Sequence, residues 1–214
     1  MTPTRILLVD DYPVVLRGLK EVLLEGIPDA AFGEAADGGG AVKEVERADW
    51  DAVILDVSLP DTSGLEVLKQ LHALRPTLPV LVLSMYSEEQ FAMRVLRAGA
   101  AGYMTKKAAS KELVEAVRKV VSGGKYVSSS LAERLASAIE LRPDDSRAPH
   151  ETLSDREYQV FRMLAVGMTV KDVAEKLALT PQTVSTHRTR ILEKMAMASN
   201  TELVQYAIQN GLLG

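Results

Sequence analysis

The stretch VILDVSLPD, residues 53–61, joins a buried strand to a polar residue at its end. Its first three residues are apolar with no polar residue between them, which is typical of a strand covered on both faces of a parallel sheet. Asp56 then stands where the apolar run stops, ahead of a loop that contains Pro60. Ligands of an open parallel sheet bind beyond the carboxyl ends of its strands. We therefore expect Asp56 to belong to a site.

Short apolar runs alternate with helical patterns through the first half of the chain. The runs are RILLV at 5–9, AAFGEAA at 30–36, DAVIL at 51–55, LPVLVL at 78–83 and AGYM at 101–104. Each is followed by apolar residues at helical spacing, and this alternation predicts a parallel sheet with helices on both faces. We expect an α/β, flavodoxin-like (βα)5 domain over residues 1–121.

The rest of the chain predicts a linker and an all-α domain. Residues 122–152 are expected to be a linker, with one amphipathic helix at 129–141 and a polar stretch that contains two prolines. Four helices are expected in 153–214, with capping boxes of Ser154 with Glu157 and of Ser199 with Glu202, and with Thr180 as a cap ahead of Pro181. At 214 residues, two modest domains are the natural division of the chain.

Composition excludes several kinds of protein. There is no cysteine, so neither a disulfide framework nor a thiolate metal site is expected. No apolar run approaches the ~20 residues of a membrane span, and the N-terminus lacks a secretory signal. We therefore expect a cytoplasmic protein with no membrane partner.

Net charge gives little indication of nucleic-acid binding. The formal charge is −4, with 17 Lys and Arg against 20 Asp and Glu in residues 1–142, and 7 against 6 in residues 153–214. The C-terminal part is therefore only faintly basic, and an expectation of DNA binding must rest on where its charges lie.

Carboxylates end two of the predicted strands. Asp10 and Asp11 follow the first apolar run and Asp56 ends the third. If the strand order is 2-1-3-4-5, these strands are neighbours and the three carboxylates converge. They repel one another unless one is protonated or a cation lies between them, and Mg²⁺ suits such a site. The alternative is that each aspartate only caps a following helix or loop.

Two further polar residues end later strands. Ser84 follows LPVLVL, and Lys106 follows the short fifth strand. Near the carboxylates, a lysine ammonium would pair with one of them or with a phosphoryl group attached to it, and a serine hydroxyl would donate to the same oxygens. Taken alone, Ser84 is an ordinary turn residue and Lys106 a solvated charge.

These motifs resemble the receiver domain of bacterial two-component response regulators over residues 4–121. The matching segments are LVDD at 8–11, DVSLPDTSG at 56–64, the strand that ends in Ser84, and GAAGYMTKK at 99–107. The resemblance implies that Asp56 accepts a phosphoryl group from a sensor histidine kinase. It also implies a Mg²⁺ site made of Asp10, Asp11, Asp56 and the backbone carbonyl of Ser58.

The same resemblance assigns the remaining residues of the site. It implies that Lys106 pairs with phosphorylated Asp56, that Ser84 moves toward the phosphoryl oxygens, and that Tyr103 turns between exposed and buried positions. The residue after the key lysine is often proline in this family, but here it is Lys107, which is a possible substitute for Lys106.

The stretch TVKDVAEKLALTPQTVSTHRTRILEKM, residues 169–195, has the outline of a helix-turn-helix. Three apolar residues of its second helix are expected to face the domain core: Val184, Ile191 and Met195. Five polar residues then fall on the opposite face: Gln182, Ser185, Thr186, Thr189 and Arg190. That pattern is equally typical of a helix that shows its polar face to water only. The local charge of +2 over 181–196 favours DNA.

Residues 153–213 resemble the LuxR-type DNA-binding domain of NarL/FixJ-class regulators. The matching segments are LSDREYQVFRMLAVG, the helix-turn-helix itself and SNTELVQYAIQNGL. The resemblance implies base contacts by Ser185, Thr186 and Thr189. It implies phosphate contacts by Thr169, Lys171, Thr183, Arg188, Arg190 and Lys194, and a homodimer contact through 201–210. Ala196 departs from the family, which usually has glycine in this turn.

Together these features predict a two-component response regulator whose phosphorylation at Asp56 controls binding to double-stranded DNA and transcription. We do not expect an enzyme. A homodimer through the C-terminal helix, with the receiver as a further possible contact, would add affinity through two half-sites. One alternative is a Mg²⁺-dependent phosphohydrolase, which commonly has an acid two residues after the nucleophile, where this chain has Ser58. Another is a DNA-binding protein whose receiver works without phosphorylation.

Overall fold

The computed structural model describes residues 3–85, 88–107, 110–133 and 148–213. The chain forms two compact units, Met1–Ser137 and Ala138–Gly214. Among the described residues, no helix is both long and apolar enough to cross a membrane. Of the helix expected at 129–141, residues 129–133 are helical, and the remainder lies outside the described residues.

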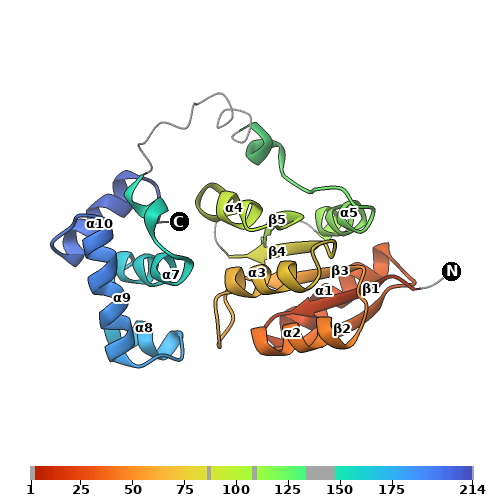
Figure 1. The fold of residues 1–214 in the computed structure, drawn as a ribbon. Helices are drawn as coiled ribbons and strands as arrows, with labels where there is room; N and C mark the ends of the chain where they lie inside the picture. Colours follow the sequence, from red (N-terminus) through yellow and green to blue (C-terminus); the bar gives the residue numbers. More distant parts are fainter. Residues whose placement is uncertain (1–2, 86–87, 108–109, 134–147, 214) are drawn as a thin grey trace. The chain divides into compact units, whose positions relative to one another are not determined.

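The first unit is built on the expected parallel sheet (Figure 1). Its strands are β1 (Arg5–Val9), β2 (Ala31–Ala35), β3 (Ala52–Asp56), β4 (Val80–Ser84) and β5 (Gly102–Thr105). Their order is β2-β1-β3-β4-β5 and every pair is parallel, which confirms the predicted fold and order. Every residue of β3 and β4 is buried, as their unbroken apolar runs predicted.

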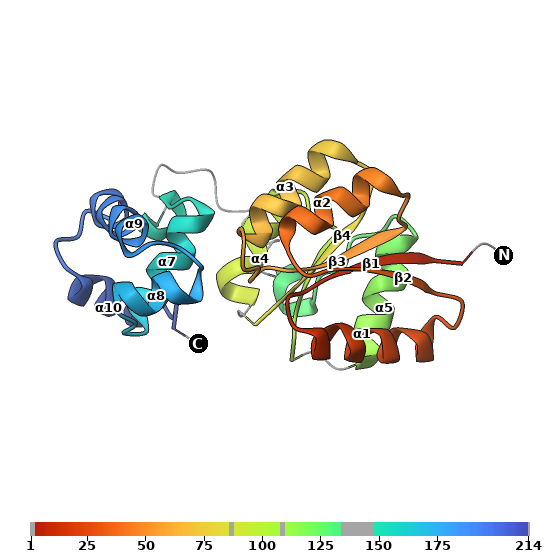
Figure 2. The ribbon, with the colours of Figure 1, turned by 90° about the horizontal axis from the view of Figure 1, so that it is seen from below.

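Helices cover both faces of this sheet. They are α1 (Pro13–Gly26), α2 (Gly38–Arg47), α3 (Gly64–Leu74), α4 (Glu88–Arg97) and α5 (Ser110–Val121). Figure 2 shows α1 and α5 on one face and α2 and α3 on the other. Alternate strand residues such as Ile6 and Ile54 pack with Leu16 of α1 and Val117 of α5 in one hydrophobic core.

The three consecutive glycines after β2 lie inside a helix. A run of glycines is more typical of a turn between strand and helix, but Gly38–Gly40 make the first turn of α2. Two carboxylates hold that turn. Asp37 accepts from the Gly40 N–H at 2.6 Å, and Asp61 accepts from the Gly38 and Gly39 N–H groups at 2.9 and 3.0 Å. Carboxylates stabilise the positive end of a helix, which compensates for the weak helix propensity of glycine.

Within residues 148–213, the second unit has four α-helices after a short 3-10 turn, η1 (Pro149–Thr152). They are α7 (Asp155–Ala165), α8 (Val170–Lys176), α9 (Pro181–Lys194) and α10 (Asn200–Gln209). The three residues predicted to face the core, Val184, Ile191 and Met195, are buried. At the start of the unit, His150 Nδ1 lies 2.7 Å from the Tyr206 hydroxyl oxygen, which ties η1 to α10.

Most of the expected helix starts are confirmed. Ser154 and Glu157 form the predicted capping box of α7, and Thr180 caps α9 with Pro181 at its first position. The box predicted at the start of α10 is only half formed. The Ser199 hydroxyl does accept from the Glu202 N–H at 3.3 Å, but the Glu202 carboxylate accepts from the Ala198 N–H at 3.0 Å.

All four helices of the second unit end in a left-handed residue: Gly167, Ala178, Ala196 and Gly211. In each case the next amide donates to a carbonyl five residues earlier, as from Met197 to Leu192 at 2.9 Å. This is the Schellman motif, in which glycine is usual. Ala196, at φ +52°, and Ala178, at φ +50°, keep the left-handed conformation although they carry a Cβ.

Replacing either alanine should stabilise the second unit. A Cβ in the left-handed region costs about 1 kcal/mol, part of which is offset by the greater freedom of unfolded glycine. We expect Ala178→Gly and Ala196→Gly each to raise the free energy of unfolding of this unit by about 0.5–1 kcal/mol in urea titrations.

Gly167→Ala is the matched control, because a Cβ there would meet no atom within 4 Å and would change only the backbone conformation. It should lower the free energy of unfolding by about 1 kcal/mol. A loss of stability in Ala196→Gly would contradict this account of the turns.

Candidate functional site

The register of the sheet brings two of the predicted acidic residues together. Val9 of β1 pairs with Leu55 of β3, so one further residue along each strand places Asp10 beside Asp56. Asp10 extends the sheet by donating its N–H to the Ala35 carbonyl at 3.1 Å. Both carboxylates are buried, with exposed fractions of 2% for Asp10 and 3% for Asp56.

Lys106 lies between these two carboxylates. Its Nζ is 2.5 Å from Asp10 Oδ2 and 2.9 Å from Asp56 Oδ2, so one ammonium group pairs with both. The backbone explains how it reaches them, because Lys106 follows β5 directly and donates its N–H to the Ser84 carbonyl at 2.7 Å. Lys107 is exposed. The geometry thus places Lys106 at the site.

Burial dominates the electrostatics of the site. Desolvation raises the pKa of Asp56 above its ordinary value, although the charge of Lys106 opposes that rise. The pKa of Asp11 is also raised, first by desolvation and then by the charge of Asp10. Burial works against the charge of Lys106, but hydrogen bonds and pairing with the two aspartates outweigh it and raise its pKa. The lysine is therefore a fixed cation.

Three carboxylates at this edge of the sheet suit a divalent cation. One oxygen from each of Asp10, Asp11 and Asp56 can be chosen so that all lie within 4.8 Å of one another, and this is the acidic group with metal-ligand geometry in the described ranges. Among the described residues, Asp11 Oδ1 and Asp56 Oδ1 are buried and accept no hydrogen bond. Oxygens left without a donor in this way fit an oxygen-seeking ion such as Mg²⁺.

The loop after β3 is held closely against the site. Ser58 forms an isolated bridge with Ser63, and the Ser58 N–H donates to the Asp56 carboxylate. At the end of the loop, a Cβ on Gly64 would lie 2.4 Å from the Asp56 carbonyl oxygen, so only glycine fits there. The sequence analysis quoted Gly64 within a motif but gave it no role.

Asp61 is a second residue to which the sequence analysis gave no role. Its contacts with the α2 amides fasten the loop that carries Ser58 to another helix. Burial works to raise the pKa of the Asp61 carboxyl, but the amide donors outweigh it and the pKa is lowered. The only signal in the sequence was an aspartate in a loop, and its partners are 22 and 23 residues away.

The two expected switch residues are buried. Ser84 is the last residue of β4, and Tyr103 lies in β5 next to Val82. Both have an exposed fraction of 0%. Of the two positions expected for Tyr103, the structure shows the buried one.

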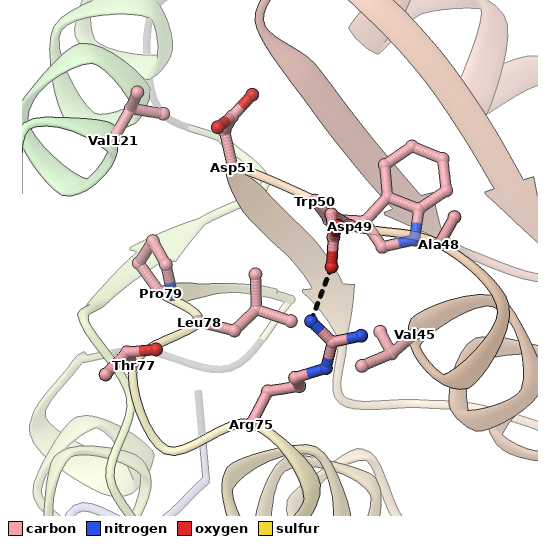
Figure 3. Close-up of a pocket in the computed structure, with 10 residues that line it drawn as sticks. All are labelled: Val45, Ala48, Asp49, Trp50, Asp51, Arg75, Thr77, Leu78, Pro79 and Val121. Carbon is pink, nitrogen blue, oxygen red and sulfur yellow. Dashed lines mark hydrogen bonds and ion pairs between the residues drawn. The ribbon is translucent and has the colours of Figure 1, made fainter.

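A pocket at the opposite end of the sheet is unrelated to this site (Figure 3). Most of its lining residues lie in the segments before β3 and β4, with Val121 from the end of α5, and its volume is 260 Å³. Asp49 and Arg75 form an ion pair of 2.6 Å across it. Trp50 lies beside them, donates its indole N–H to the Glu44 carbonyl at 3.0 Å, and has the Arg5 guanidinium 5.0 Å from its ring centroid. These contacts are structural.

The polar face of α9 is exposed, as the sequence predicted. Gln182, Thr186, Thr189 and Arg190 are exposed, and Ser185 is partly so. The Thr186 hydroxyl donates to the Gln182 carbonyl at 3.0 Å and that of Thr189 to the Ser185 carbonyl at 3.1 Å. Each hydroxyl oxygen can still accept a hydrogen bond. Lys171 is exposed on the preceding helix, α8.

Other residues expected at this surface have partners inside the unit. Arg188 Nε donates to Asn200 Oδ1 at 2.6 Å, and Lys194 Nζ lies 2.6 Å from the buried Glu157 carboxylate. The hydroxyls of Thr169 and Thr183 contact Asp172 and Thr180 at 2.7 and 2.8 Å. These side chains therefore hold the helices in place, and Arg190 and Lys171 are the cations most available to a ligand.

His187 of α9 lies in surroundings that disfavour a charged imidazole. Burial lowers its pKa, and the positive charges of Arg156 and Arg190 lower it further. A neutral imidazole at this position fits a residue packed beside the core of α9.

Two family models match the chain. One, described as the response regulator receiver domain, matches residues 6–118, and the other, described as bacterial regulatory proteins of the luxR family, matches residues 151–207. The matches coincide with the acidic site and with the four-helix unit.

Curated relatives and solved structures agree with both matches. The response regulator GacA of Pseudomonas aeruginosa is 36% identical over 211 residues, which cover 98% of this chain and 97% of GacA. The response regulator UvrY of Escherichia coli K12 is 35% identical over 209 residues, or 97% of this chain and 94% of UvrY.

Among solved structures, the response regulator RcsB of Salmonella typhimurium superposes with a TM-score of 0.59 at 25% identity, covering 96% of this chain and 98% of that one. RcsB has also been solved as a complex with DNA. With both family models and relatives over nearly its whole length in agreement, the chain belongs to the two-component response regulators that join a receiver domain to a LuxR-type DNA-binding domain.

Proposed function

We propose that Asp56 accepts a phosphoryl group from the phosphohistidine of a sensor histidine kinase and that this modification controls DNA binding by the second unit. The observation that carries the proposal is the pairing of one lysine with two buried carboxylates. It leaves Asp56 Oδ1 without a hydrogen-bond donor among the described residues. A carboxylate oxygen without a donor is the better nucleophile, while the other oxygen is held in place.

The transfer needs little covalent machinery. Asp56 Oδ1 forms a bond to phosphorus as the phosphorus–nitrogen bond of the donor breaks, and the imidazole leaves with its electron pair. Lys106 then pairs with the new phosphoryl oxygens, where positive charge stabilises the transition state. Since the Asp56 side chain is only 3% exposed, neighbouring side chains must move before a donor can reach it.

Asp10, Asp11, Asp56 and the Ser58 carbonyl would hold Mg²⁺, which supplies further positive charge to the phosphoryl oxygens. The Ser58–Ser63 bridge and the contacts of Asp61 fix the loop that presents this carbonyl. Ser84 and Tyr103 are proposed to report the phosphorylated state, as their places at the end of β4 and in β5 support.

Exposed apolar side chains around the site support a protein donor. Tyr12 and Val14, which follow Asp11, are 59% and 74% exposed. Met85, which follows Ser84, is 61% exposed. An apolar pocket of 390 Å³ lies beside Lys106, between α1 and the ends of β4 and β5. Apolar surface of this kind is typical of a place where another protein docks.

We propose that α9 binds the major groove of double-stranded DNA. Ser185, Thr186 and Thr189 would contact bases and Arg190 and Lys171 phosphates, with Thr169, Thr183, Arg188 and Lys194 as further phosphate contacts. The exposure of this face supports the proposal. The proposed dimer contact is α10, on which Ile208 is 63% exposed. A role on the chromosome places the protein in the cytoplasm.

The division of the chain into a receiver at 1–121, a linker at 122–152 and a DNA-binding domain at 153–214 remains our proposal. A phosphohydrolase is the weaker candidate, because Ser58 stands where such an enzyme commonly has its second acid. The family is one of transcription regulators, and we propose no enzymatic turnover of a separate substrate.

Phosphorylation should depend on Lys106 but not on its neighbour. Incubation with acetyl phosphate and Mg²⁺ should give a base-labile adduct, seen by mass spectrometry, that is absent from Asp56→Asn. Lys106→Ala should slow its formation by about 100-fold, because one pre-positioned cation is lost. Lys107→Ala is the matched control and should react at the parent rate. Equal loss in both lysine variants would contradict the assignment.

Lys106 should hold the pKa of the Asp56 carboxyl below the value that burial alone would give it. Burial raises the pKa of Asp56 and the ammonium of Lys106 lowers it, so Lys106→Ala should raise this pKa further. Titration of the Asp56 carboxyl by NMR without Mg²⁺ measures the midpoint. Because only the ionised form attacks, phosphorylation must fall as the pH falls through that midpoint. An unchanged midpoint in Lys106→Ala would refute the pairing.

DNA binding should separate phosphate contacts from base contacts. Arg190→Ala should weaken binding on all duplexes and reduce the slope of log affinity against log salt by about 1. Thr186→Ala should cost about 1–3 kcal/mol only on preferred sequences. Lys43→Ala, an exposed charge on α2, is the control for net charge. Lys194→Ala is a poor test, since it also breaks the pair with Glu157.

A further inference from the structure

The chain that follows α5 does not leave the first unit at once. Tyr126 forms a parallel bridge with Gly102 of β5 and donates its N–H to the Ala101 carbonyl at 2.8 Å. Tyr126 thereby lies against the edge strand of the sheet, and we call the segment that it begins, residues 126–131, the clasp. The edge strand is the one whose backbone groups are otherwise open to other chains.

The sheet has room for the clasp because of one glycine. A Cβ on Gly102 would lie 2.7 Å from the Tyr126 carbonyl oxygen and 3.0 Å from its Cβ. A real side chain at this position would therefore push the clasp away from β5. Gly102 thus allows the close approach of two backbones, which is a recognised use of glycine inside a strand.

Two acidic side chains hold the clasp from different helices. The Tyr126 hydroxyl donates to Glu112 of α5 at 2.5 Å, and the Ser128 hydroxyl donates to Glu88 of α4. Burial and the neighbouring carboxylates, first that of Glu112, raise the pKa of Tyr126, so the phenol keeps the proton that it donates. The clasp is bound to α5 at one end and to α4 at the other.

Ser128 has a second role, at the start of the next helix. Its Oγ accepts from the Leu131 N–H at 3.1 Å, which caps the helix that begins at residue 129. Leu131 itself is buried, with an exposed fraction of 1%. One hydroxyl therefore links the first residue of α4 to the helix that leads toward the DNA-binding unit.

Glu88 lies close in sequence to the phosphorylation site. It is the first residue of α4, and Ser84 is the last residue of β4. A movement of Ser84 toward a phosphoryl group on Asp56 would be felt at Glu88, because only three residues separate the two along the chain. Because a hydrogen bond weakens steeply beyond about 3.2 Å, a displacement on the order of 1 Å at Glu88 would break its bond to Ser128.

We propose that the clasp is a phosphorylation-sensitive latch: modification of Asp56 releases Ser128 from Glu88 and frees the start of the helix at 129, while Tyr126 stays on α5. The proposal rests on the phosphorylation of Asp56 proposed above. The bond between Ser128 and Glu88 is then the contact through which the first unit passes its state to the second. The clasp, a segment of this same chain, lies at the edge of the sheet beside β5.

Hydrogen exchange of the full-length chain tests the latch through Glu88, the partner of Ser128 that takes no part in the helix cap. Glu88→Ala removes the acceptor but leaves the Ser128 cap, so a purely local capping role predicts no change in the helix at 129. The latch predicts that amides of 129–133 exchange about fivefold faster or more in this variant without any phosphodonor. Ser130→Ala is the matched control, an exposed serine two residues from Ser128, and should exchange as the parent does.

The same measurement with acetyl phosphate and Mg²⁺ tests the release. In the parent, peptides that cover 126–133 should exchange faster once Asp56 is phosphorylated, and in Glu88→Ala the donor should add little. Equal exchange in Glu88→Ala and the parent without donor, or unchanged exchange in a parent shown by mass spectrometry to be phosphorylated, overturns the latch. Absence of the adduct would instead contradict the proposed function, while the comparison without donor still decides whether Glu88 holds the clasp.

Discussion

The position of one ammonium group between two buried carboxylates is the constraint on which the receiver unit depends. Asp10 and Asp56 are nearly free of solvent, and their charges would repel one another without Lys106. The lysine pairs with one oxygen of Asp56 and leaves the other free of donors among the described residues. The ion pairs that stabilise the two buried carboxylates therefore also leave one oxygen of Asp56 available to react.

The polar residues of the site come from three strand ends, and the sheet provides their relative positions. Register alone brings Asp10 beside Asp56, and the Lys106 amide is held by the carbonyl of Ser84. Lys106 is thereby joined both to Asp56 and to the last residue of β4. In the second unit, the face of α9 is presented by helices fixed by their own contacts, such as the pair between Lys194 and Glu157. The side chains of each site are thus held by contacts within their own unit.

Local patterns in the sequence predicted the strands and most helix caps, because these depend on residues near one another in the chain. The strand order entered only as a condition, because it depends on pairing between distant segments. Ser154 and Glu157 are three residues apart, and their capping box was predictable. The hydrogen bonds that Asp61 accepts from α2, and the bond from Ser128 to Glu88, join residues that are 22 to 40 positions apart in the sequence. No periodicity marks these pairs. The choice between Lys106 and Lys107 needed the direction in which the chain leaves β5. For the same reason, the partners of Arg188 and Lys194 were not expected from their charge.

The place of Trp50 makes it an internal reporter of one unit only. It is the single tryptophan of the chain, and it lies before β3, at the end of the sheet away from the aspartates. Its ring lies on Gly33 of the edge strand β2, where a Cβ would come within 2.2 Å of it. The second unit contains two tyrosines, Tyr158 and Tyr206, but no tryptophan. Indole fluorescence, excited at wavelengths that tyrosine does not absorb, therefore follows melting of the receiver sheet without labelling, and a loss of helix by circular dichroism that leaves this fluorescence unchanged reports unfolding elsewhere in the chain.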